Sequence, residues 1–288
     1  MESDNLQQMR RKPGIGKNAA DMLPEKPFQT ARIHQQAGRF DEARAIYERV
    51  IEQAPRHTHC LYLLGVLHYQ TGSPDQALDY MSRALAENDL SHVLHAHKGE
   101  ILRVLGRYEE AVAECRRALE LKAVLPEALN TLGASLTVLG RAGEAIEALH
   151  EAVEYKPDLV EAYANLGIAF RAGGDYEKAA DALQKALKIQ PEFFGVLAIL
   201  GAVRQDQGLF EEAAACYRRV LAARPDDAPI LSSLATTLTN LGKTDEAIAC
   251  YREALRVAPD LATALQGMAE AEKMHGETPI APAEPNGP

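Results

Sequence analysis

The sequence predicts an all-α fold, a solenoid of antiparallel helix pairs with seven repeats and a C-terminal capping helix. Three observations indicate it. An alanine recurs every 34 residues without an insertion, a glycine precedes each alanine by five residues, and each repeat contains two stretches of helical apolar spacing. The alanines are Ala43, Ala77, Ala111, Ala145, Ala179, Ala213 and Ala247.

The fifth repeat shows how the first helix of a repeat is recognised. Tyr163, Leu166, Gly167 and Phe170 fall at i, i+3, i+4 and i+7, which is one face of an α-helix. Glycine readily adopts the left-handed conformation that ends helices, so Gly174 is expected to end this one. The equivalent glycines are Gly38, Gly72, Gly106, Gly140, Gly208 and Gly242.

The second helix of the same repeat begins after Asp175, whose side chain can accept a hydrogen bond from the first backbone amides of a helix. Ala179, Leu183 and Ala186 continue the helical spacing, and Pro191 closes the repeat. The closing position holds Pro55, Asp89, Ala123, Pro157, Pro191, Pro225 and Pro259 in chain order.

Small residues recur where the two helices of a repeat are expected to cross. Only a residue with little or no side chain lets two helix backbones approach closely, and larger neighbours fill the surrounding space. A larger residue at the crossing should overpack it, at a cost of about 1–3 kcal/mol. The small residues of the first helices are Gly65, Gly99, Gly133, Gly167, Gly201 and Ala235.

The repeats divide the chain into a solenoid at residues 24–275 and two tails. Residues 1–23 are polar with a short basic run, and residues 276–288 are rich in proline, so both are predicted to be disordered. The charged capping helix at 262–275 suits the terminal repeat's need for a polar outer face. The repeats start near residues 24, 58, 92, 126, 160, 194 and 228.

A 34-residue helix–turn–helix repeat with this pattern of small and large residues resembles the tetratricopeptide repeat. The stretches AYANLGIAF at 162–170 and DYEKAADALQKALKIQP at 175–191 carry the resemblance. It implies a right-handed superhelix whose first helices line a concave groove for a protein or peptide ligand. The array also resembles the repeat arms of bacterial O-GlcNAc-transferase-like and sulfotransferase proteins, without their catalytic domain.

Composition and charge argue against several classes of protein. The formal net charge of −10 is unlike that of a nucleic-acid binder, which usually has a basic face. No run approaches the ~20 apolar residues that span a bilayer, and the polar N-terminus lacks a secretory signal. The cysteines show no CxxC spacing, which favours free thiols in a reducing compartment. We therefore expect a cytoplasmic protein that binds neither nucleic acid nor membrane.

The histidines between residues 57 and 97, six of nine in the chain, are the best candidate for a metal site. A zinc site needs three or four ligands in a fixed geometry, and no histidine pair has the HExxH spacing. The sequence also contains no GxSxG motif or comparable nucleophile signature. We expect no metal site, no cofactor and no catalytic residue, and therefore no enzyme.

The repeat register places nine candidate partner-binding residues on the groove side of the first helices. Tyr62 and Tyr69 lie seven residues apart, so both point into the same trough. Beside Arg103 they form the expected binding hot spot, because tyrosine and arginine are the residues that most often anchor a partner. The candidates are His59, Tyr62, Val66, Tyr69, His97, Glu100, Arg103, Asn130 and Arg171.

The leading interpretation is a non-catalytic scaffold or adaptor that binds a protein or peptide partner in the concave groove. One alternative is a substrate-recruiting or regulatory arm of a glycosyltransferase- or sulfotransferase-type enzyme. Another is a self-assembling structural scaffold that forms homo-oligomers. A genomic neighbour encoding a transferase would favour the first alternative, and concentration-dependent oligomers would favour the second.

Overall fold

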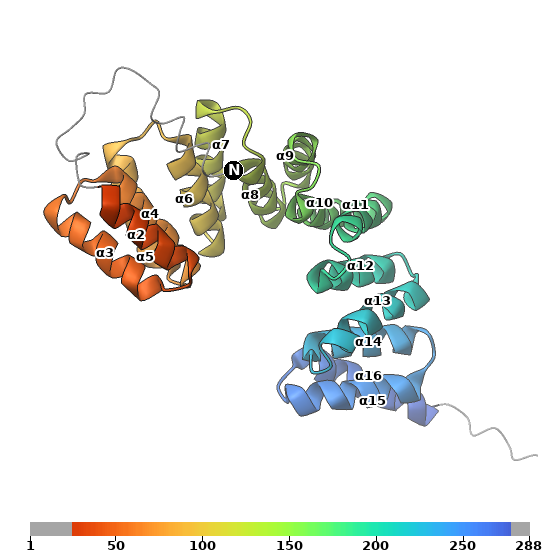
Figure 1. Ribbon diagram of the computed structural model, residues 1–288. Helices are drawn as coiled ribbons and strands as arrows, with labels where there is room; N and C mark the ends of the chain where they lie inside the picture. Colours follow the sequence, from red (N-terminus) through yellow and green to blue (C-terminus); the bar gives the residue numbers. More distant parts are fainter. Residues whose placement is uncertain (1–24, 278–288) are drawn as a thin grey trace, which may run out of the picture. The chain divides into compact units, whose positions relative to one another are not determined.

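The computed structural model describes residues 25–277, which are helical with short turns and contain no strand. The 15 helices of this described part form antiparallel pairs followed by one single helix (Figure 1), which confirms the predicted fold class. The predicted tails at 1–23 and 276–288 lie outside the described residues, apart from the end of the last helix. The pairs are α2 (Glu25–Gln36) with α3 (Phe40–Gln53), α4 (Thr58–Gln70) with α5 (Pro74–Glu87), α6 (His92–Val104) with α7 (Tyr108–Leu121), α8 (Pro126–Val138) with α9 (Ala142–Tyr155), α10 (Val160–Ala172) with α11 (Tyr176–Ile189), α12 (Phe194–Asp206) with α13 (Phe210–Ala223), and α14 (Ala228–Asn240) with α15 (Thr244–Val257); α16 (Ala262–Glu277) follows.

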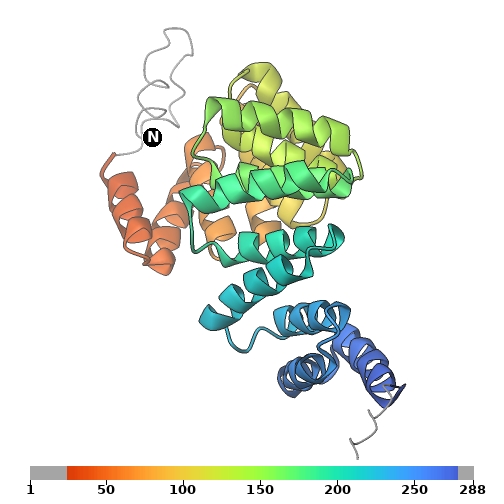
Figure 2. The ribbon, with the colours of Figure 1, turned by 90° about the vertical axis from the view of Figure 1, so that its right-hand side faces the viewer.

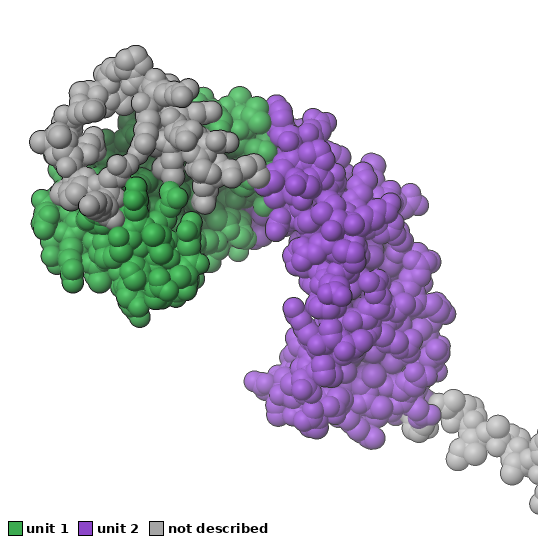
Figure 3. All heavy atoms as spheres, in the orientation of Figure 1, with its two compact units in different colours: residues 1–132 green, residues 133–288 purple. Residues whose placement is uncertain are grey.

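First helices pack both within their own repeat and against the next repeat. The α4 helix contacts its partner α5 and also α6, the first helix of the following repeat. In the same way α12 contacts both α10 and α14. The antiparallel pairs are also visible from the side in Figure 2. The chain divides into two compact units, unit 1 (residues 1–132) and unit 2 (residues 133–288), which are coloured separately in Figure 3.

Glycines end the first helices in a left-handed backbone conformation. All seven predicted turn glycines have φ between 72° and 79°, a region that side-chain-bearing residues rarely adopt. A Cβ atom would meet nothing within 4 Å at any of these turns. The requirement for glycine there is therefore conformational and not steric.

The glycines at the helix crossings are needed for space. A Cβ atom on Gly167 would lie 2.5 Å from Leu183 Cγ, and one on Gly99 would lie 2.7 Å from Cys115 Sγ. Leu183 and Cys115 are fully buried on the second helices, so neither has open space to move into. The close crossing that the small residues predict is present in both repeats.

Three second helices bury a tyrosine four residues after the recurring alanine. Tyr47, Tyr217 and Tyr251 are at most 2% exposed. Their hydroxyls reach polar groups on the first helix of the same repeat; Tyr217, for example, donates to Gln205 Oε1 at 2.5 Å. Burial raises the pKa of Tyr47 and of Tyr217 to about 12, which keeps both hydroxyls protonated and able to donate.

The last helix, α16, packs against α15 and α14. Gly267 makes this possible, because a Cβ atom there would lie 2.5 Å from Cζ of the buried Tyr251. Leu265 of α16 is exposed, whereas the equivalent residues of the two preceding repeats, Leu231 and Leu197, are buried. Within the described chain, every helix falls short of the length and apolar character that a bilayer span requires.

Candidate binding face on the first helices

Four aromatic rings form a continuous run along the first helices of unit 1. Phe28 of α2 lies 5.9 Å from His59 of α4, and His59 lies 6.3 Å from Tyr62, measured between ring centroids. Tyr62 meets His97 of α6 edge-on at 5.3 Å, and its hydroxyl is 3.1 Å from His97 Nε2. His59 is exposed and the other three rings are partly buried. The run, hereafter the ring run, therefore joins three successive repeats and presents aromatic surface to solvent.

Beside the ring run, the carboxylate of Glu100 connects three first helices. Tyr69 of α4 donates a hydrogen bond to Oε1 at 3.0 Å, and Thr131 of α8 donates to Oε2 at 2.9 Å. Arg103, one turn further along α6, donates through Nε at 2.9 Å and Nη2 at 2.7 Å. A bidentate arginine–carboxylate pair is among the stronger protein hydrogen-bond arrangements. Both oxygens of Glu100 are thus occupied, and Tyr69 and Arg103 are held in place.

The charges in this Glu100 network reinforce one another. Burial alone would raise the pKa of the Glu100 carboxyl, but the donors Arg103, Thr131 and Tyr69 favour its charged form and hold the pKa below its ordinary value. Burial and the nearby Glu100 charge raise the pKa of Tyr69 to about 12. At neutral pH the network therefore contains an ionised Glu100, a charged Arg103 and a protonated Tyr69.

We expect the Glu100 network to stabilise the fold only where Glu100 is ionised. Because its pKa is lower in the folded chain, the stabilisation is fully present above the ordinary carboxyl pKa of 4.5 and is lost as the pH falls through the folded pKa. The measurement is urea unfolding of wild type and Glu100→Gln between pH 7 and pH 3. The difference in unfolding free energy should shrink toward acid, and a difference that does not vary with pH would contradict this account.

The remaining candidates lie in different surroundings. Val66 is partly buried and packs against the apolar core of unit 1, between Tyr62 and Tyr69 along α4. Asn130 is partly buried on α8, next to Thr131. Arg171 belongs to unit 2, where its Nε lies 2.5 Å from Asp206 Oδ2. The structure thus joins Tyr62 to His97 and Tyr69 to Glu100 and Arg103, whereas Arg171 takes part in a separate ion pair.

Two residues of the face were missing from the sequence-based set, although the repeat register contained the signal. Phe28 lies 34 residues before Tyr62, and Thr131 lies 34 residues after His97. Each therefore occupies the same place in its repeat as a residue that was selected. The resemblance alone could not show that a phenylalanine in the first repeat continues the ring run.

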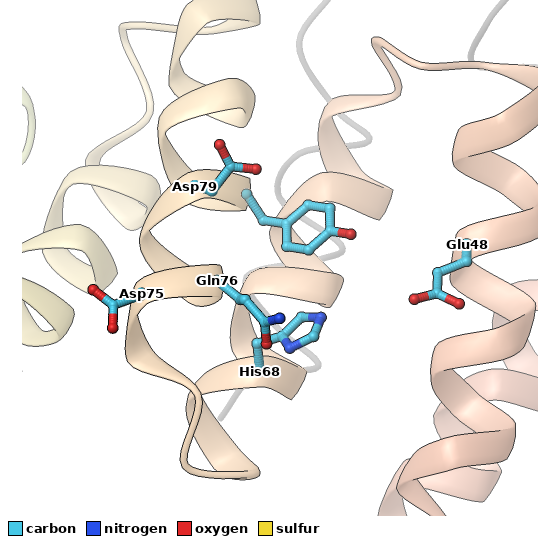
Figure 4. Close-up of a pocket in the computed structure, with 6 residues that line it drawn as sticks. Glu48, His68, Asp75, Gln76 and Asp79 are labelled. Atoms are coloured by element: carbon cyan, nitrogen blue, oxygen red, sulfur yellow. The ribbon is translucent and has the colours of Figure 1, made fainter.

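A separate acidic pocket of about 380 Å³ lies between α3, α4 and α5. Figure 4 shows Glu48 of α3 across the pocket from His68 and Gln76. The His68 ring stacks on Tyr80 at 5.3 Å, and burial holds its pKa below the ordinary value, so it is neutral at pH 7. Across the described residues, no three His, Cys, Asp or Glu side chains are arranged to hold a metal ion. The lining residues are Glu48, His68, Asp75, Gln76, Asp79 and Tyr80.

The four cysteines are free thiols in the structure. Burial raises the pKa of Cys60 and of Cys115 to about 12, and it also raises the pKa of Cys216 and Cys250. A nucleophilic cysteine needs the opposite, a thiol whose pKa is lowered toward neutrality. At neutral pH these thiols are therefore protonated, as is usual for cysteines that pack against neighbouring side chains.

Comparison with protein families matches the tetratricopeptide repeat over residues 28–92, 94–124, 124–192 and 196–260. Among solved structures, the chain is similar to one from the APC/C hetero-tetramer Cut9-Hcn1, with 16% identity and a TM-score of 0.72, over 87% of this chain and 49% of that one. This chain thus spans about half the length of that relative.

Two further solved structures extend the comparison. A tetratricopeptide repeat protein from Parabacteroides merdae ATCC 43184 has 15% identity and a TM-score of 0.67, over 86% of this chain and 98% of that one. YrrB, a protein of the same kind with an unusual peptide-binding site, has 20% identity and a TM-score of 0.54, over 66% of this chain and 97% of that one. At these identities the solved structures support the fold alone. With its repeats matched along most of the described residues, the chain belongs to the tetratricopeptide repeat family.

Proposed function

We propose that the chain is a non-catalytic adaptor whose first-helix face in unit 1 binds an extended segment of a partner protein. Proteins built from tetratricopeptide repeats typically mediate protein–protein interactions. The observation that supports this face is the ring run, which offers aromatic surface from three consecutive repeats. An extended segment laid along it meets one repeat after another, and each ring adds apolar contact area.

The Glu100 network adds a preorganised edge to this face. Tyr69 and Arg103 are held by Glu100 before any partner arrives, so they lose little further side-chain freedom on binding. Arginine and tyrosine in such positions commonly act as anchors of protein interfaces. Together, the ring run and the network would form a binding face of aromatic rings bordered by a fixed polar group.

The test begins with affinity capture on the full chain and identification of bound proteins by mass spectrometry. The affinity of each candidate is then measured by titration calorimetry against wild type, His59→Ala and Tyr62→Ala. Tyr62→Ala should weaken binding about 30-fold, because truncating an aromatic anchor commonly costs about 2 kcal/mol or more. Tyr176→Ala is the matched control, since Tyr176 is an exposed tyrosine on α11 of unit 2.

The outcome separates this proposal from the two alternatives. Unchanged affinity of a correctly folded Tyr62→Ala variant would place binding elsewhere on the chain. A transferase as the captured partner, with product formation reduced by the same variant, would favour the recruiting arm. A molecular mass that rises with concentration in light scattering would favour the self-assembling scaffold.

A further inference from the structure

The third repeat carries charged side chains at positions where other repeats pack apolar ones. His95 and Lys98 of α6 and Glu114 of α7 lie between the two helices of this repeat, and their side chains are 12%, 23% and 18% exposed. Charged side chains with so little exposure are usually paired, because removing a charge from water is costly. In the two neighbouring repeats the corresponding residues are Leu61 and Leu129 for His95, Leu64 and Leu132 for Lys98, and Tyr80 and Ala148 for Glu114.

The ring of His95 connects two structural elements. Its Nδ1 lies 2.5 Å from Oε2 of Glu114, whose other oxygen is 2.7 Å from Lys98 Nζ. On the opposite side of the ring, Nε2 lies 3.0 Å from the backbone oxygen of Asp89, in the turn between α5 and α6. His95 thus joins the turn to α7.

Both ring nitrogens therefore face oxygen atoms that act as acceptors. A backbone carbonyl has no proton to donate, and an ionised carboxylate has none either. A neutral imidazole carries a proton on only one nitrogen, so it satisfies one of these contacts and turns a lone pair toward the other oxygen. The doubly protonated ring satisfies both.

We propose that His95 is a proton-dependent latch between the second and third repeats. When both ring nitrogens are protonated, the latch is closed and holds the turn at residues 88–91 against the third repeat. Loss of one proton opens it, so the latch is closed on the acid side and open on the alkaline side. Histidine is suited to this role because its charge ordinarily changes between about pH 5 and pH 8.

The surrounding charges decide which contact is released. Glu114 attracts the Nδ1 proton, and its other oxygen is paired with Lys98. The group that faces Nε2 is the neutral backbone carbonyl of Asp89, which attracts a proton less strongly than a carboxylate does. The side-chain carboxylate of Asp89 is in the same turn. Lys98 is also attracted by Glu110 of α7. The neutral ring therefore keeps its Nδ1 proton and loses the contact to Asp89.

The turn itself has few other attachments. Its position 89 is an aspartate where five other repeats have the closing proline, so the backbone there is less restricted. Leu90 is 64% exposed and contributes little burial. Leu90 N bonds to Asn88 Oδ1 at 3.3 Å within the turn, and Ser91 caps α6 by accepting from Leu94 N. Besides the Ser91 cap, the contact from His95 is a second side-chain link between this turn and the third repeat, and it continues to α7 through Glu114.

The first measurement is nitrogen NMR of the full chain labelled with ¹⁵N-histidine, with the His95 signals assigned by their loss in His95→Gln. We expect protons on both nitrogens at pH 6.0 and on Nδ1 alone at pH 8.5. A ring with a single proton at pH 6.0, or with both protons at pH 8.5, would overturn the latch. The protonation state is read from the spectra of the wild-type chain, and the variant serves for the assignment alone.

The second measurement is hydrogen exchange of the peptide that covers residues 86–94, corrected for the intrinsic effect of pH. In the wild type, protection of the turn should fall about tenfold from pH 6.0 to pH 8.5, the effect of one lost hydrogen bond. In His95→Gln, protection of the turn should not change with pH. The control is His150→Gln, which removes an exposed histidine of α9, and its protection should change with pH as in the wild type. Equal pH dependence in wild type and His95→Gln would also overturn the proposal.

Discussion

Replacing Gly167 with valine should destabilise the fifth repeat by about 3 kcal/mol, at the upper end of the usual cost of overpacking a core. The first added carbon would already lie 2.5 Å from Leu183 Cγ and 3.2 Å from the backbone oxygen of Ala179. Leu183 is fully buried on α11 and cannot turn into open space, so α10 and α11 would have to separate.

The control for this prediction is Gly143→Ala on α9. A Cβ atom on Gly143 would meet nothing within 4 Å, and the residue is exposed with an ordinary helical backbone. Alanine there should stabilise the chain by about 0.5–1 kcal/mol, because glycine loses more conformational freedom in a helix. Urea unfolding followed by circular dichroism gives the overall effect. Hydrogen exchange of α10 and α11 locates it, since repeat arrays need not unfold as a single unit. A Gly167→Val chain as stable as wild type would contradict the close crossing.

Replacing Glu100 with alanine should destabilise unit 1 by about 2–3 kcal/mol at neutral pH, since hydrogen bonds to a charged group are strong and their partners are left unsatisfied. The substitution removes the acceptor from Tyr69, Arg103 and Thr131 together. Thr131 is only 5% exposed, so water replaces the lost hydrogen bond poorly. The cost should appear as reduced hydrogen-exchange protection in α4, α6 and α8.

The matched control is Glu110→Ala on α7, which also removes a glutamate that is bidentate with an arginine. Glu110 and its partner Arg107 are 57% and 46% exposed, and this pair stays within one repeat. Such an exposed pair contributes little to stability, because water screens both charges. Similar losses for Glu100→Ala and Glu110→Ala would show that the connection between repeats adds nothing beyond a surface ion pair.

The helices and turns could be predicted from the sequence because their causes are local. The left-handed turn at Gly174 depends on the absence of a side chain in that residue, and the structure has its φ at 79°. The start of α11 depends on Asp175, whose side chain accepts from Lys178 N as expected. The crossing of α10 and α11 depends on Gly167 and Leu183, which lie in one repeat and recur with it.

The candidate binding face was only partly predictable. The register correctly indicated that Tyr62, Tyr69 and Arg103 belong to first helices, but it treated them as independent anchors. In the structure Tyr69 and Arg103 share the carboxylate of Glu100, and Tyr62 bonds to His97. The sequence offered no way to see that these side chains also hold the repeats together.

The separation of these pairs explains why. Tyr62 and His97 are 35 residues apart, whereas Tyr69 and Glu100 are 31 apart, and so are Glu100 and Thr131. The first separation is one residue longer than the 34-residue period, and the other two are three residues shorter. The two offsets differ by four residues, about one helical turn. These offsets depend on how one first helix packs against the next, and the 34-residue period does not reveal them.

The sequence by itself therefore determined the family, the helix pairs, the turn glycines and the small residues at the crossings. Each of these follows from backbone conformation or from packing within one repeat, where the residues involved recur together. Only the tertiary structure decided that Glu100 connects three first helices and that His95 lies between Glu114 and the Asp89 carbonyl. Those contacts are made by long polar side chains that could reach more than one partner. Distance, burial and charge decide which partner each of them contacts once the helices are packed.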